Sequence, residues 1–141
     1  ICQEARERLQ NLEREGVHQN LDPSDFDGPP YRSGVEKLVE SANRHEAFAT
    51  GILYDAASDL GTALASVVSL FNPARLIVHS ILTEARDLFA EQVRFMIRKN
   101  CLELYSRNLN LEFRTYSPET NATGAAAFSR DGYFKKTLGV E

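Results

Sequence analysis

The sequence predicts a helix-rich α/β fold with about two parallel strands, and three segments carry that prediction. Residues 76–78 form a short apolar, β-branched run beside turn-forming residues, which is typical of an interior parallel strand. Between Ala85 and Ile97 the apolar residues recur at the spacing of one helical face. Residues 109–115 alternate apolar and polar side chains, as a half-buried strand near a sheet edge does. Strand, helix and strand in this order predict parallel strands joined by a right-handed crossover.

The start of the chain predicts a helix followed by a loop. Residues 1–15 are dense in charge and predict a helix with a narrow buried stripe made of Ala5, Leu9 and Leu12. Gly16 is expected to end this helix. Residues 16–32 hold three prolines and few apolar side chains, so we expect a surface loop there.

Two further helices are predicted before the first strand. Ser33 is expected to cap a short helix. Residues 45–71 predict a long helix whose later half is apolar on nearly every side, which is typical of a helix buried between other elements. Gly61 within it indicates that something packs too closely for a side chain. Asn72-Pro73 then stops the helix, because the residue before a proline is driven out of the α region.

A last helix is predicted near the end of the chain. Ser117 and Pro118 form a helix-start signal, with the serine as cap and the proline in the first turn. The small residues 124–127 would permit close backbone approach to a neighbour. Cys101, at the end of the preceding amphipathic helix, is expected to be buried packing.

Composition limits the class of protein. A chain of 141 residues with 43% apolar residues can bury one core, so residues 1–141 are expected to form a single domain. The net charge of -4 argues against a broad nucleic-acid-binding face. Polar side chains interrupt the longest apolar stretch, residues 52–71, which excludes it as a membrane span. Two distant cysteines show neither a disulfide framework nor a closed zinc site, so we expect a cytoplasmic protein. Without a membrane span, we expect no membrane partner.

Several segments together resemble the ROK family of bacterial sugar-responsive repressors and sugar kinases. Residues 59–78 resemble its Leu-Gly helix, Asn-Pro stop and apolar strand, and residues 123–127 resemble its closing Gly-Ala-Ala segment. Residues 42–49 resemble the turn that opens the long helix, although His45-Glu46 stands where Gly-Asp is usual. The chain looks most like the xylose and N-acetylglucosamine repressor-type regulators. The resemblance implies the C-terminal portion of a ribonuclease-H-like, actin-like ATPase lobe.

The sequence departs from the family's ATP-binding members at His79-Ser80. In those members the corresponding strand runs into a Gly-Gly turn, where glycine lets the backbone approach the nucleotide at no steric cost. The resemblance places Gly61, His79, Ser80 and Gly124 around a degenerate nucleotide pocket. We therefore expect weak or no ATP binding, as in the family's repressors.

Cys2 resembles the last cysteine of the family's zinc motif in its distance from the Asn-Pro stop. A structural zinc ion needs about four ligands. This chain alone is thus expected to hold no cofactor, while zinc remains an expectation for the intact protein. The alternative is an unpaired cysteine.

These observations lead to two functional hypotheses. The first is the C-terminal part of the effector domain of a ROK-type sugar-responsive repressor, an effector-binding and oligomerisation lobe without its DNA-binding domain. The alternative is the C-terminal part of an ATP-dependent, glucokinase-like sugar kinase of the same family. Either way the catalytic aspartate would precede Ile1, so no enzymatic activity is expected from this chain. A third interpretation is an oligomerisation or scaffolding lobe alone.

The expected partners follow from the first hypothesis. They are a sugar or sugar-phosphate effector in the intact protein, DNA only through a helix-turn-helix encoded before this segment, and a second copy of the chain. A two-stranded sheet has little stability by itself and leaves an unpaired edge. We therefore expect the chain to form a homodimer or larger assembly, or to cover that edge with its own helices.

Overall fold

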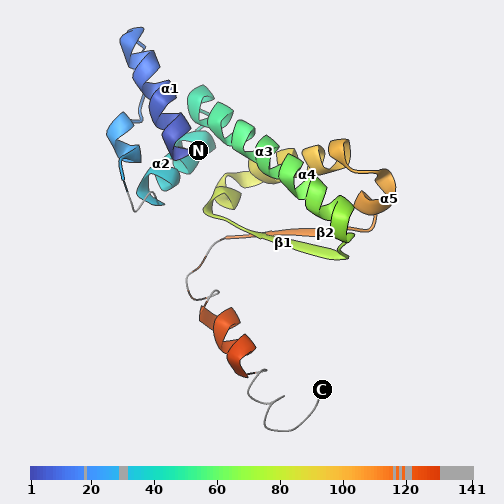
Figure 1. Ribbon diagram of the computed structural model, residues 1–141. Helices are drawn as coiled ribbons and strands as arrows, with labels where there is room; N and C mark the ends of the chain where they lie inside the picture. The colour runs from blue at the N-terminus through green and yellow to red at the C-terminus, as the bar shows by residue number, and fades with distance from the viewer. Residues whose placement is uncertain (18, 29–31, 116, 118, 120–121, 131–141) are drawn as a thin grey trace, which may run out of the picture.

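The chain forms helices packed on one face of a two-stranded sheet (Figure 1). The computed structural model describes residues 1–17, 19–28, 32–115, 117, 119 and 122–130. Residues 122–130 are helical. The other elements, in chain order, are α1 (Cys2–Arg14), η1 (Pro23–Phe26), α2 (Arg32–Asn43), α3 (Ala47–Phe71), β1 (Arg75–His79), η2 (Ile81–Glu84), α4 (Arg86–Asn100), α5 (Glu103–Ser106) and β2 (Asn110–Arg114).

The sheet consists of β1 and β2, which run parallel as the sequence predicted. Arg75 lies opposite Asn110, and the register continues to His79 opposite Arg114. One face packs on the core through alternate residues of both strands, as a period of two requires: Leu76, Leu111 and Phe113. The opposite face of β1 is exposed at Arg75, Ile77 and His79.

A helical layer made of α3 and α4 covers the inner face of the sheet (Figure 1). The apolar face predicted for α4 is confirmed, since Phe89, Val93 and Ile97 are at most 2% exposed. Gly61 of α3 faces α4, where an added Cβ would lie 2.6 Å from the Met96 Cβ and 2.9 Å from the Val93 carbonyl oxygen. The close approach predicted at Gly61 is therefore confirmed, and the neighbour is a helix.

The N-terminal elements close the core around the first half of α3. The stripe predicted for α1 is buried at Ala5 and Leu9, and Arg8 joins α1 to α3 through an ion pair of 2.8 Å with Asp55. The segment predicted as a surface loop, residues 16–32, contains η1, whose Phe26 is 3% exposed. The side chain of Asp22 accepts the Ser24 backbone N–H at 2.8 Å and so holds this turn.

Two local predictions need correction, and one short helix was missed. Ser33 lies inside α2, which begins at Arg32, so Ser33 does not precede that helix as a cap. The later half of α3 was predicted to be buried on nearly every side, yet Leu70 is 76% and Phe71 69% exposed. The cause is that α4 covers only one side of this half among the described residues, where Ala65 and Val68 are buried. The short helix α5 was not predicted.

Candidate functional site

The sequence predicts a degenerate nucleotide pocket at the end of β1, and there Ser80 caps the following helix η2. The Ser80 hydroxyl accepts the Leu82 backbone N–H at 3.2 Å, and its carbonyl oxygen accepts the Thr83 hydroxyl at 2.7 Å. Its own backbone N–H donates to the Arg114 carbonyl at 3.1 Å, which ties the turn to β2. The φ angle of Ser80 is -158°, an extended conformation that any residue adopts. The turn thus has its own side-chain cap and needs no glycine.

The other residues assigned to that pocket lie in different surroundings. His79 is exposed at the end of β1, and Gly61 is buried between α3 and α4. Gly124 lies in the helical residues 122–130, all of which are exposed, and no described residue comes within 4 Å of an added Cβ there. The close approach that the small residues around Gly124 would permit stays a prediction. Gly61 is used in helix packing, whereas His79 and Ser80 share one turn.

Cys2 is half-buried in α1, and burial raises the pKa of its thiol. Among the described residues there is no group of three or more His, Cys, Asp or Glu side chains able to hold a metal ion. A single thiol is one potential ligand of the roughly four that structural zinc needs.

Cys101 joins the ends of α3 and α4. Its thiol donates to the Ala65 carbonyl at 3.1 Å and lies 3.5 Å from the Ser69 hydroxyl. The thiol is half-buried at this junction. This is the packing role predicted from the sequence, with a polar contact added.

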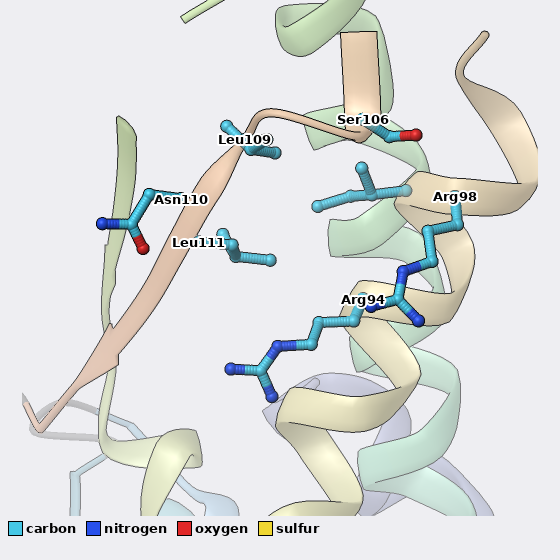
Figure 2. Close-up of a pocket in the computed structure, with 7 residues that line it drawn as sticks. Arg94, Arg98, Ser106, Leu109, Asn110 and Leu111 are labelled. Carbon is cyan, nitrogen blue, oxygen red and sulfur yellow. The ribbon is translucent and has the colours of Figure 1, made fainter. Parts of the chain in front are cut away.

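A pocket of about 240 Å³ lies between α4 and the start of β2 (Figure 2). The α4 wall consists of Arg94, Ile97 and Arg98, and the opposite wall of Ser106 and residues 109–111. Figure 2 shows Arg94 and Arg98 on the α4 side, with Leu109 and Leu111 facing them from the other wall. The Asn110 amide points away from the arginines and donates to Glu112 at 3.1 Å on the exposed face of the sheet. Two cations and the hydroxyl of Ser106 therefore line one hollow.

The sequence analysis missed this pocket, because it considered only the apolar face of residues 85–97. Arg94 and Arg98 are four residues apart and so share one helical face. A like-charged pair at this spacing is unfavourable by itself, and that is the signal that could have drawn attention to it. The opposite wall comes from a segment that follows a turn, which periodicity alone does not place.

A small network of ion pairs lies on the exposed face of the sheet. The carboxylate of Glu112 accepts from Arg75 at 2.9 Å and from Arg114 at 3.1 Å. The hydrogen bond from Arg75, followed by that from Arg114, lowers the pKa of Glu112. All three side chains are partly or largely exposed, so this network orders the face without a large gain in stability.

The chain is similar in sequence to a known repressor. The chain is 30% identical over 92 residues to the DNA-binding transcriptional repressor Mlc of Escherichia coli (strain K12). The match covers 65% of this chain and 23% of Mlc, so the chain spans less than a quarter of the length of that protein. No protein-family model matches the chain.

A solved structure shares the fold. The crystal structure of a ROK family transcriptional regulator, a homolog of the E. coli Mlc protein, matches with a TM-score of 0.62 and 20% identity. The match covers 82% of this chain and 28% of that one. The helix-rich α/β fold with two parallel strands is thus a fold found within ROK regulators, and the predicted resemblance to ROK-family repressors is confirmed. None of the described helices combines the length and apolarity needed to cross a bilayer.

Proposed function

We propose that this chain is part of the effector domain of a ROK-type, sugar-responsive transcriptional repressor of the cytoplasm. The intact protein would bind DNA through a separate helix-turn-helix and a sugar or sugar phosphate through its effector domain. Mlc and the ROK family protein of known structure are described as transcriptional regulators, which favours this assignment over the sugar kinase. A ligand that binds two domain arrangements unequally would shift their populations and thereby DNA affinity.

The observation that carries the proposal is the turn after β1. A nucleotide-binding turn needs open backbone, and here the imidazole of His79 is added while Ser80 caps η2 with its side chain. A regulator does not need this turn to admit a nucleotide. The turn therefore supports a fold that keeps ligand sensing without phosphoryl transfer.

Nucleotide and DNA binding by the complete encoded protein test the proposal. We expect no ATP binding by calorimetry at micromolar ATP with magnesium, and sugar-dependent binding to operator DNA. A variant carrying both His79→Gly and Ser80→Gly serves as the matched control, because it restores the open turn alone. Micromolar ATP affinity of the unaltered protein, or sugar phosphorylation, would favour the kinase.

Self-association through the exposed end of α3 is the second part of the proposal. Leu70, Phe71, Leu102 and Leu104 are 69 to 76% exposed, and α5 contacts α3 at this end. Exposed apolar side chains that gather in one place are typical of interfaces. Light scattering of this chain should show a dimer or larger species that Leu70→Asp converts to monomer. A monomer at high concentration before substitution would contradict a second copy as the partner.

Zinc in the intact protein is the remaining proposal. Cys2 would supply one thiolate, and the other ligands would come from residues outside this chain. Metal analysis of the purified intact protein should find about one zinc per chain, and Cys2→Ser should lower that content. A stable, metal-free intact protein would leave Cys2 as an unpaired cysteine.

A further inference from the structure

The corner of the molecule around α5 has a charge opposite to that of the whole chain. Between residues 91 and 107 there are four cationic and two anionic side chains, whereas the full chain carries a net charge of -4. The cations lie on α4 and just after α5, next to the pocket of Figure 2. A local positive field within an acidic protein attracts anions to this corner.

The arginines of this corner differ in how they are held. Arg94 donates to Glu91 at 2.9 Å, and its guanidinium lies 4.9 Å from the centre of the Phe113 ring. Arg98 and Arg107 make no side-chain hydrogen bond or ion pair within the described part of the chain. Two guanidinium groups are therefore available for an external partner, beside a third that is fixed.

Arg98 lies at the meeting point of two adjoining hollows. One is the pocket between α4 and β2, and the other is lined by Arg98, Cys101, Glu103, Ser106 and Arg107. Arg98 and Ser106 line both. The Ser106 hydroxyl has only a 3.4 Å contact to the Glu103 carbonyl, at the limit of a hydrogen bond, so it can turn toward a ligand.

We propose that Arg98, with Arg94, Arg107 and Ser106 around it, forms a binding site for a small phosphate-bearing anion. The planar guanidinium presents paired donors that match phosphate oxygens, and a bound oxyanion removes the repulsion between Arg94 and Arg98. The hollow between α4 and β2 has a volume of about 240 Å³, which gives room for inorganic phosphate or a small phosphomonoester.

This site is separate from the turn after β1. Residues 109–111 lie where β2 begins, whereas His79 and Ser80 follow the end of β1. Because the strands are parallel, the two sites are at opposite ends of the sheet. The phosphate site therefore does not depend on the proposed regulator function, and an anion bound here would act at a distance from the strand-end turn.

Phosphate titration of this chain tests the site. Inorganic phosphate is added at constant ionic strength set with chloride, and amide shifts are followed by nuclear magnetic resonance. We expect saturable binding with a Kd below about 1 mM and the largest shifts near Arg98 and Ser106. Glycerol 3-phosphate forms the second arm: tighter binding would identify a phosphomonoester, and equal binding the free anion.

Lys99 provides a matched control for Arg98. Lys99 is the next residue, carries the same charge and is exposed, but it is not among the residues lining either hollow. Arg98→Gln should weaken phosphate binding at least about 10-fold, and Lys99→Gln less than about 2-fold, with both variants keeping the thermal midpoint of the parent chain. Equal losses in the two variants, or no saturable binding by the parent chain, would overturn the site.

Discussion

The two halves of α3 are similarly apolar but have very different surroundings. In the first half, Ala49, Ile52, Leu53 and Ala57 are 0% exposed, whereas near the end of the helix Leu70 is 76% and Phe71 69% exposed. The first half is enclosed by α2 and shares its core with α1 residues, while the last turns contact α4 and α5 on one side. An apolar sequence thus shows what a helix can bury, but the neighbours decide what it does bury. The first half of α3 therefore buries more of its apolar side chains within this chain than the last turns do.

The sharpest test of this comparison removes the same side chain from each half. Leu53→Ala should lower the free energy of unfolding by about 2–5 kcal/mol, because it leaves a cavity in the core. Leu70→Ala should change it by less than about 0.5 kcal/mol, because most of that side chain is already in solvent. Urea denaturation of dilute protein measures both. A loss at Leu70 equal to that at Leu53 would mean that the end of α3 is covered in solution.

Gly61 and Gly51 extend the test to backbone packing. Gly61→Val should cost about 1–3 kcal/mol, because the new side chain meets Met96 and the Val93 backbone and forces α3 and α4 apart. Thermal unfolding gives the change. A stable Gly61→Val variant would show that α3 and α4 can separate freely, contrary to the packing described.

Gly51 is the counterpart with open space. Nothing lies within 4 Å of an added Cβ at Gly51, so Gly51→Ala should raise stability by about 0.4–1 kcal/mol through a better helix propensity and a less flexible unfolded chain. The same thermal unfolding experiment applies. Destabilisation by Gly51→Ala would show that another residue packs closely against Gly51 in the first half of α3.

His45 offers the smallest expected effect, at the turn that leads into α3. Its φ angle is 63°, in the left-handed region. This conformation is unfavourable for most residues, and only glycine, and to a lesser extent Asn and Asp, adopt it readily. His45→Gly should therefore raise stability by about 0.5 kcal/mol after the extra entropy of glycine in the unfolded chain is counted. Asn72, with φ of 44°, is the control, because asparagine tolerates this region and Asn72→Gly should change little.

Much of the fold followed from the sequence, because periodicity reports directly on one-sided burial. The buried face of α4, the stripe of α1 and the two strands were all predicted from spacing. The end of α3 was not, because an all-round apolar pattern does not reveal whether a neighbour lies within the same chain. The prediction that Ser33 caps a helix was wrong, because α2 already begins at Arg32.

The candidate sites were predictable only in part. His79 and Ser80 were singled out by resemblance, but the cap that Ser80 provides depends on where Leu82 and Thr83 fold back. The arginine pocket joins α4 to residues that follow a second turn, so its two walls come together only in three dimensions. A charge count along residues 91–107 would have pointed to it.

The register of the sheet has a consequence for how the chain folds. Arg75 pairs with Asn110, so closing the sheet means joining residues separated by the whole of η2, α4 and α5. Pairing residues so far apart in sequence lowers the conformational entropy of the chain before the contacts that compensate for it have formed. Helices, in contrast, form from residues that are neighbours in sequence. We expect the strands to meet late, after α4 has docked on α3. Until then, β1 would expose its backbone on both edges, and the folding chain would be most open to mispairing in that interval.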